Sequence, residues 1–423
     1  MINRLKPKSE FSRNVLTLMT GTTIAQAIPI AITPILTRLY TPEDFGILAL
    51  FVAVTAILGS IASGRYELAI MLPEKDEDAI NVAALGLLIA LFFAIVLLIP
   101  TIFLNEQITS LLGNQEIGFW LYFVPFVVLM TGLFNVLNYL NTRKKLYKDL
   151  SKALIYRSTI GAAAQISIGF LKSGATGLIT GQILSQLVAN IRLMLNVRRE
   201  YLDKKLSFER IKFLSKRYKD FFIYSTLGAL SNTSAQYVVN ILISSIYNLT
   251  TLGFFYLAQR VLIIPSMVVG SSFSQVFYQA ATIEMQEKGS ATGIYKKTLL
   301  KLVLLSIIFF LPVYFLAEWL FRFFFGEEWH ASGEIAVLLL PLIATQFVAS
   351  TLSAVFNVFE KQKLALIWQV LLLIISILTI VVSSVFDLSF MSFLTFYSWI
   401  ITLMYMFYIY ISFRVAQGDK YPA

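Results

Sequence analysis

Long apolar segments alternate with short polar ones along the whole chain of 423 residues. A helix that crosses a bilayer needs about 20 mostly apolar residues. The pattern therefore predicts an all-α polytopic membrane protein with about twelve transmembrane helices. The predicted spans, with ends uncertain by a few residues, are 13–39, 46–72, 79–103, 117–140, 153–171, 174–196, 219–246, 252–282, 298–321, 332–357, 364–386 and 388–413.

The composition supports this class and excludes several chemistries. Hydrophobic residues make up 57% of the chain and charged residues 14%, whereas soluble domains carry about 25% charged residues. The chain has no cysteine and one histidine, His330, so Cys-ligated metals and His-based metal clusters are excluded. A Gly-Lys-Ser/Thr phosphate loop is also absent. We expect no catalytic residue, no metal and no cofactor.

The distribution of Lys and Arg predicts the orientation. If the N-terminus is cytoplasmic, the inner segments hold most of the Lys and Arg of the loops, and the outer segments hold only Arg38, Lys172 and Arg322. Cytoplasmic loops are enriched in these residues. The bias predicts that both termini are cytoplasmic, and it explains the net charge of +10 without a nucleic-acid partner.

The longest connection divides the chain into two halves. It is basic and covers about 198–218. We therefore predict an N-terminal six-helix bundle over 1–197, a basic cytoplasmic linker over 198–218 and a C-terminal six-helix bundle over 219–423. A weak repeat supports duplication, because YTPEDFG (40–46) resembles YNLTTLG (247–253), each between the first and second spans of its half.

Arginines inside predicted spans are candidates for binding an anion, because charge at membrane depth is costly and is usually paired or functional. Arg260, about eight residues into its span, is the strongest candidate. Arg65 stands two residues before Glu67, and pairing between helices explains it as well as function does. Arg157 is a turn inside its span and could instead reach the membrane surface. We add Arg38, at the outer end of the first span, to the candidates for substrate binding.

Neutral polar residues recur at helical spacing in several spans. Such stripes either join helices by hydrogen bonds or line a shared hydrated cavity, and their amides suit sugars and other polar solutes. The candidates for substrate binding are Gln26, Gln182, Gln186, Asn232, Gln236 and Asn240.

Glu67 could couple transport to a proton or Na⁺. It lies toward the end of its span, where a solvated carboxylate is the alternative interpretation.

Four motifs resemble a known family. They are TRLYTPEDFG (37–46), GRYELAIMLPEKDEDA (64–79), YKDFFIYSTLGALSN (218–232) and LAQRVLIIPSMVVGSSFSQVFYQAA (257–281). They resemble the Wzx-type O-antigen and exopolysaccharide flippases of the multidrug/oligosaccharidyl-lipid/polysaccharide exporter (MOP) superfamily. One departure is Phe222, where members of the family usually have proline.

The resemblance implies two six-helix bundles around a central cavity that opens alternately to the two membrane faces. It implies that undecaprenyl-diphosphate-linked oligosaccharide moves across the bacterial inner membrane, for O-antigen or capsule and exopolysaccharide assembly. It also implies that Arg65 and Arg260 are the motif arginines of the second and eighth helices. A polysaccharide polymerase and a chain-length regulator are possible partners, besides membrane lipid.

Two other functions stay open at this point. A small-molecule drug exporter of the same superfamily usually takes cations, for which an acid-lined cavity would be expected. A membrane glycan polymerase would need catalytic groups outside the membrane, and the largest outer connection, about 322–331, offers Arg322, Glu327, Glu328 and His330. We expect a transporter and not an enzyme.

Overall fold

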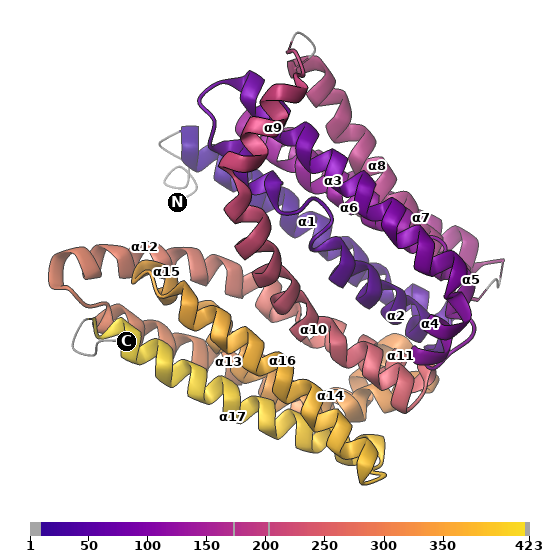
Figure 1. Ribbon diagram of the computed structural model, residues 1–423. Helices are drawn as coiled ribbons and strands as arrows, with labels where there is room; N and C mark the ends of the chain where they lie inside the picture. The colour runs from indigo at the N-terminus through magenta and orange to yellow at the C-terminus, as the bar shows by residue number, and fades with distance from the viewer. Residues whose placement is uncertain (1–9, 172–173, 202–203, 419–423) are drawn as a thin grey trace. The chain divides into compact units, whose positions relative to one another are not determined.

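A computed structural model describes residues 10–171, 174–201 and 204–418. Within these ranges the regular structure is helical throughout, without a strand, which confirms the all-α prediction (Figure 1). Lys172 and the basic residues counted before residue 10 lie outside the described residues. The chain forms two compact units, Met1–Thr233 and Ser234–Ala423, with the boundary inside one helix. The predicted division at 198–218 rests on the longest connection and stays a prediction.

The first unit contains nine α-helices, two short irregular helices and the start of a tenth α-helix within its described residues. Their bounds are α1 (Glu10–Leu39), α2 (Pro42–Gly59), η2 (Tyr66–Met71), α3 (Asp76–Phe103), α4 (Asn105–Leu111), α5 (Ile117–Leu121), α6 (Val124–Arg143), α7 (Tyr147–Gly169), α8 (Thr176–Tyr201), α9 (Phe208–Arg217), η3 (Phe221–Ser225) and α10 (Thr226–Ile246).

The second unit continues from α10 to the C-terminal helix. The bounds are α11 (Leu249–Leu262), η4 (Ser266–Gly270), α12 (Ser271–Lys288), α13 (Thr292–Phe325), η5 (Glu327–Trp329), α14 (His330–Leu352), α15 (Val355–Val358), α16 (Gln362–Val385) and α17 (Phe390–Ala416).

Nine helical segments in the described part of the chain are long and apolar enough to cross a membrane. They correspond to nine of the twelve predicted spans. The remaining three, 153–171, 219–246 and 252–282, are helical as α7, α10 and α11–α12 but fall outside that set. The last is interrupted between α11 and α12, because Pro265 has no N–H to continue the helical ladder. Broken helices at membrane depth are common in transporters.

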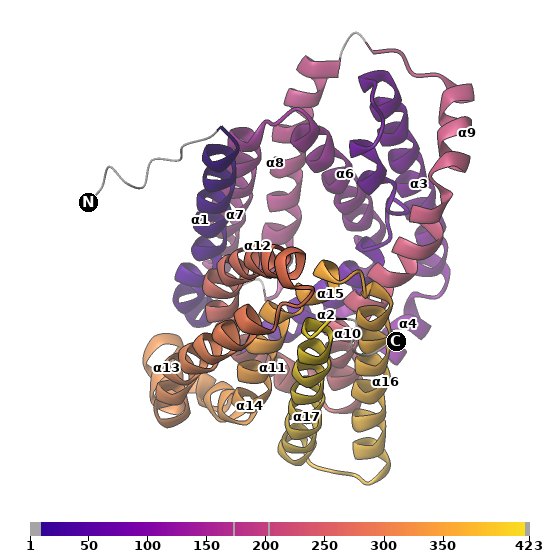
Figure 2. The ribbon, with the colours of Figure 1, turned by 90° about the vertical axis from the view of Figure 1, so that its left-hand side faces the viewer.

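The first unit is organised around α7, which packs between α1 and α8 (Figures 1 and 2). Tyr40, at the end of α1, fastens this arrangement. Its hydroxyl donates to the carbonyl of Gln165 at 2.6 Å, and its ring touches Gly169 and Gly177. A Cβ on Gly177 would collide with that hydroxyl, so glycine is required there for close approach.

The second unit repeats this device and strengthens the case for duplication. Thr41 and Asn248 are both N-caps, and each side chain accepts a hydrogen bond from the N–H three residues on. Tyr247 matches Tyr40, and its hydroxyl donates to the carbonyl of Leu388 at 3.3 Å. Its ring stacks on Phe393. Tyr40 thus anchors the end of α1 to the last turns of α7, and Tyr247 anchors the end of α10 to the connection between α16 and α17.

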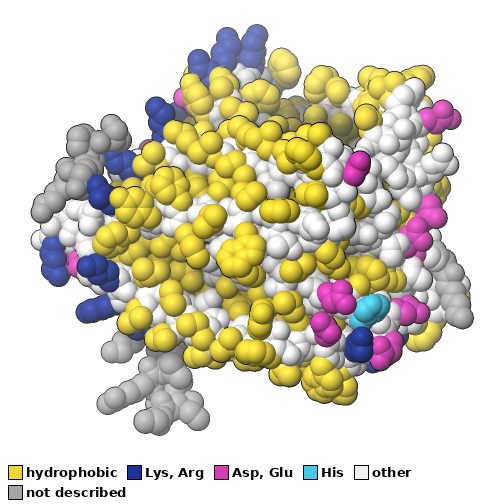
Figure 3. Space-filling model, turned by 90° about the horizontal axis from the view of Figure 1, so that it is seen from below, with side chains coloured by type: hydrophobic (Ala, Val, Ile, Leu, Met, Phe, Trp, Pro, Cys, Tyr) yellow, Lys and Arg dark blue, Asp and Glu magenta, His cyan; other side chains and the backbone are white. Residues whose placement is uncertain are grey.

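The surfaces that face lipid are recognisable by exposed apolar side chains. On α3, for example, Phe92 is 69% exposed and Phe103 is 75% exposed. On the face over α13, α16 and α17, hydrophobic side chains lie between an end with Lys and Arg and an end with Asp and Glu (Figure 3). Both observations fit a multi-pass membrane protein.

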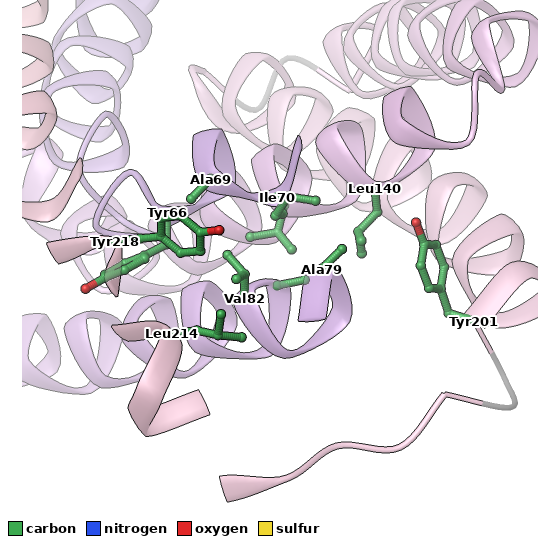
Figure 4. Close-up of a cluster of buried hydrophobic side chains, with 11 residues drawn as sticks. Tyr66, Ala69, Ile70, Ala79, Val82, Leu140, Tyr201, Leu214 and Tyr218 are labelled. Carbon is green, nitrogen blue, oxygen red and sulfur yellow. The ribbon is translucent and has the colours of Figure 1, made fainter. Parts of the chain in front are cut away.

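A compact apolar cluster supports one end of the first unit (Figure 4). Tyr66 and Ile70 of η2 pack with Val82 of α3, Leu140 of α6 and Leu214 of α9. The Tyr66 hydroxyl also donates to the carbonyl of Ser215 at 2.9 Å. These contacts fix η2 between α3, α6 and α9, and so determine where the residues just before it lie.

Candidate functional site

The predicted second span, 46–72, is interrupted before η2. Helix α2 ends at Gly59, a run of turns follows, and both Gly64 (φ 59°) and Arg65 (φ 61°) adopt the left-handed conformation. Glycine is needed at 64, since a Cβ would lie 2.8 Å from the ring of Phe222. Arginine in this conformation costs about 1–2 kcal/mol. Non-glycine residues held in this way cluster at functional sites.

The break brings together three polar residues, of which Ser63 and Glu67 are buried and Arg65 is partly exposed. Arg65 NH1 lies 3.2 Å from Glu67 Oε1, and Ser63 Oγ donates to Glu67 Oε2 at 2.6 Å. The Glu67 side chain is 1% exposed and that of Arg65 is 28% exposed. The solvated interpretation of Glu67 is therefore wrong, because the packing of η2 encloses the carboxylate and a cation neutralises it.

Arg65 keeps donors available after this pairing. A guanidinium has five N–H groups, and Glu67 contacts one terminal nitrogen. The Nε atom is buried and has no hydrogen-bond partner among the described residues. Because the side chain is partly exposed, a ligand could reach the open edge of the guanidinium. A planar, forked donor set of this kind matches phosphate oxygens.

An ionic network lies beside this site, at the start of α3. Asp76 accepts from Arg143 Nε at 2.9 Å and from Lys144 Nζ at 2.6 Å. Asp78 accepts from both Nε and NH2 of Arg210 in α9, and this hydrogen bonding raises the pKa of Arg210. The acidic loop thus ties the connection after α6 and the predicted linker to the same end of the unit.

In the second unit, Arg260 lies in the last turn of α11, immediately before the break at Pro265. A cation there is favoured by the helix dipole, by about 0.3–1 kcal/mol. Its side chain is half-buried and makes a contact within the protein. Arg65 and Arg260 therefore share a feature that the sequence did not reveal, namely a position next to an interruption of the second helix of each half.

The other predicted cations have local partners. Arg38 is exposed and donates from NH1 to the carbonyl of Pro34 at 2.6 Å. Arg157 of α7 lies over the ring of Phe134, 5.3 Å from its centroid. Gln26 is half-buried on α1.

The polar stripes differ in what they contact. On α8, Gln186 Nε2 donates to Thr131 Oγ1 of α6 at 2.7 Å, while Gln182 has no side-chain partner among the described residues. On α10, Asn240 is buried, and its Oδ1 has no partner in the described part of the chain. Asn232 and Gln236 are exposed on the same helix, and each interacts with another residue of the protein. Gln186 thus joins helices, and a role in binding sugar stays a prediction for all these amides.

Sequence reasoning missed Ser63 and the aspartates of the ionic network. A serine after a small-residue turn gives no periodic signal. Asp76 and Asp78 belong to an acidic loop within the motif 64–79. Acidic residues contribute little to orientation in the membrane, and the sequence gives no sign of the basic residues with which these two pair.

A model of the polysaccharide biosynthesis protein family matches residues 35–334. The chain belongs to this family. A curated relative, the succinoglycan biosynthesis transport protein ExoT of Rhizobium meliloti (strain 1021), is 25% identical over 311 residues. This match covers 72% of the chain and 60% of ExoT, so the family member described here spans less than two thirds of that relative.

Solved structures identify the fold of this family member. The lipid II flippase MurJ, in an inward closed conformation, matches with a TM-score of 0.69 at 15% identity, over 96% of this chain and 87% of that chain. An inward-facing multidrug resistance MATE family transporter of the MOP superfamily matches with a TM-score of 0.59 at 15% identity, over 94% and 93% of the two chains. The fold is that of the MOP superfamily, as the motifs indicated.

Proposed function

We propose that the protein is a flippase for undecaprenyl-diphosphate-linked oligosaccharide. It would move the repeat unit from the inner to the outer leaflet of the bacterial inner membrane, with both termini cytoplasmic, for O-antigen or capsule and exopolysaccharide assembly. Family membership supports a role in polysaccharide biosynthesis. The MurJ-like fold supports a mechanism in which one bundle rocks against the other.

The observation that carries the proposal is the state of Arg65. Glu67 contacts one terminal nitrogen of a guanidinium whose side chain is still 28% exposed, so Arg65 has donor capacity left for an anion. Diphosphate would take up these donors, and the lipid tail would stay in the bilayer. Arg260 would bind diphosphate in the second unit, and Arg38 and Arg157 would add positive charge. The sugars would contact the amides, namely Gln26, Gln182, Gln186, Asn232, Gln236 and Asn240.

Glu67 provides a route to ion coupling. When diphosphate binds Arg65, it competes with Glu67 for the same cation. A buried carboxylate that loses its counter-ion takes up a proton or a cation, because isolated charge in a low dielectric is costly. We therefore propose that a proton or Na⁺ follows the substrate through Glu67, with no other cofactor. A polymerase and a chain-length regulator would take up the product.

The test is a deletion strain complemented by the wild type, by Arg65→Ala and by Arg65→Lys. Surface polysaccharide and the leaflet that holds the lipid-linked repeat unit are measured. We expect the repeat unit to accumulate on the cytoplasmic face in the deletion and Arg65→Ala strains, with partial export for Arg65→Lys. Arg199→Ala, an exposed arginine outside the site, is the matched control. Normal export without the protein would refute the proposal.

Two alternatives remain useful as outcomes. The MATE-like fold would suit a drug exporter. A cationic drug would need an acidic side chain to bind, but Glu67 is already neutralised by Arg65. A polymerase would use the outer connection, where Arg322 lies 3.6 Å from Glu327 and His330 Nδ1 lies 3.1 Å from the Glu327 carbonyl. Glycan elongation by purified protein that is lost in Glu328→Gln would favour the polymerase.

A further inference from the structure

A polar hollow of about 810 Å³ lies just beyond the end of α3, between α4 and the loop that leads to α5. Sites for small molecules measure about 300–1,000 Å³, so the hollow has a suitable size. Its lining is polar, with Asn105, Glu106, Thr109, Ser110, Asn114 and Gln115 contributing.

Two of these residues hold the walls in place. Asn105 Nδ2 donates to the carbonyl of Gly118 at 2.9 Å, and Thr109 Oγ1 donates to the carbonyl of Asn105 at 2.5 Å. Gly118 lets α5 approach closely, since a Cβ there would lie 3.1 Å from Asn105 Oδ1. The hydrogen bond between Asn105 and Gly118 therefore joins α4 to α5 at the edge of the hollow.

The other lining groups are available for a ligand. Glu106 and Ser110, one turn apart on α4, have no side-chain hydrogen bond or ion pair within the described ranges, and the same holds for Gln115. Asn114 accepts from the N–H of Glu116 at 2.6 Å through Oδ1, which leaves its Nδ2 to donate. The hollow thus offers acceptors and donors side by side.

The chemistry of the lining selects one class of ligand. No Lys or Arg lines the hollow, so phosphate has no cation to bind there. The polar lining also disfavours acyl or isoprenoid chains. Sugar hydroxyls both donate and accept, and they match a carboxylate, two amides and a hydroxyl.

The position of the hollow points to the outer membrane face. The exposed apolar residues of α3 continue to its last residue, Phe103, shortly before α4, while the basic residues that pair with Asp76 and Asp78 gather at the opposite end of α3. Helix α3 has 28 residues, or about 42 Å at 1.5 Å per residue, which exceeds a hydrocarbon core of about 30 Å. Basic ends are cytoplasmic, so the hollow opens on the other side.

We propose that this hollow is an exit site that binds the oligosaccharide of the repeat unit by its sugar hydroxyls on the outer face. This site rests on the proposed function for its ligand, but its residues are distinct from the arginines and amides assigned to the substrate above. Glu106 and Asn114 are assigned as the main contacts.

The test is equilibrium dialysis of the full-length protein in nanodiscs against a radiolabelled oligosaccharide. The oligosaccharide is one repeat unit cleaved from the cell's own surface polysaccharide, free of lipid and phosphate, and tritiated by reduction. We expect saturable binding that falls about tenfold or more in Glu106→Gln/Asn114→Ala, since hydrogen bonds to a charged group are among the stronger ones. Glu116→Gln, an exposed acid outside the lining, should bind as the wild type does.

A second measurement does not depend on those variants. The chain has no cysteine, so Ser110→Cys creates a single thiol in the hollow. A membrane-impermeant maleimide should modify it in intact cells, and the free oligosaccharide should slow that reaction severalfold. The exit site would be overturned if the thiol reacts only after the cells are opened, or if the oligosaccharide leaves the rate of labelling unchanged. It would also be overturned if pyrophosphate competes for the site, or if the wild type and the double variant bind the oligosaccharide equally.

The two proposals fail separately. Cytoplasmic accumulation of the repeat unit in the deletion strain, together with no binding at the hollow, would remove the exit site alone. Normal export in the deletion strain, together with Glu106-dependent binding, would remove the flippase function and leave a carbohydrate site.

Discussion

Replacement of Arg65 separates the stability of the site from its function. Glu67 is 1% exposed, and in Arg65→Ala it keeps only Ser63 as a side-chain partner among the described residues. Breaking a buried ion pair by removing one partner costs about 3–5 kcal/mol. Because Arg65 is itself 28% exposed, we expect a loss near the lower end, about 3 kcal/mol. Arg65→Ala/Glu67→Ala removes the orphaned charge and should recover about half of that loss without restoring transport.

The backbone at Arg65 gives a second, sharper comparison. Alanine at φ 61° carries a penalty of about 1–2 kcal/mol that glycine avoids, and glycine loses about 0.5–1 kcal/mol of chain entropy in return. Arg65→Gly should therefore be more stable than Arg65→Ala by about 0.5–1 kcal/mol. Arg157 lies inside α7, so Arg157→Gly should be less stable than Arg157→Ala by about 1 kcal/mol.

The assay is the free energy of unfolding by SDS titration in mixed micelles, with helicity read by circular dichroism. The difference in stability between the glycine and alanine variants should have opposite signs at positions 65 and 157, so the pair of variants at each position is a control for the pair at the other. An Arg65→Ala variant as stable as the wild type would refute the buried ion pair. An Arg65→Gly variant less stable than Arg65→Ala would refute the left-handed conformation.

Three further changes test the packing of the first unit. Gly177→Ala should lower the free energy of unfolding by about 1–3 kcal/mol through overpacking against Tyr40. Tyr40→Phe in the same chain should recover part of this loss. If the losses of the two single variants instead add up in the double variant, the contact between these residues is contradicted. Gln186→Leu should cost about 1–2 kcal/mol, because the Oγ1 of Thr131 in α6 loses the donor from Gln186. Transport corrected for folded protein should not change if the amide only joins helices. Asp78→Asn should speed hydrogen exchange in α9 by releasing Arg210, with Glu209→Gln at an exposed position as the control. Unchanged exchange would mean that apolar contacts alone hold α9 in place.

The helices were predictable because lipid imposes a simple rule on sequence. Each crossing needs a long apolar run, and such runs gave the class of fold. The repeat at Tyr40 and Tyr247 was also legible, and the structure gives both tyrosines the same kind of anchor. Apolar runs say nothing of interruptions, so the breaks before η2 and after α11 were missed.

The site was predictable only in part. Arg65 and Glu67 stood out as charges in an apolar segment, but their pairing depends on the left-handed turn at Gly64 and Arg65, where Gly64 packs against Phe222. A stripe at helical spacing shows which side chains share a face and not what that face meets. Gln186 therefore looked like a cavity residue and bonds Thr131 instead. The hollow near Glu106 lies in a polar connection, where periodicity carries no information.

The most direct test of the account is flipping by the purified protein. Proteoliposomes are loaded with undecaprenyl-diphosphate-linked oligosaccharide, and a lectin added outside reports the glycan that reaches the outer leaflet, with and without a proton or Na⁺ gradient. We predict that the wild type makes most of the lipid-linked glycan accessible and that Arg65→Ala leaves about half of it inside, as in protein-free vesicles. If folded wild-type protein leaves the inner pool protected under every gradient, the protein is not a flippase for this lipid.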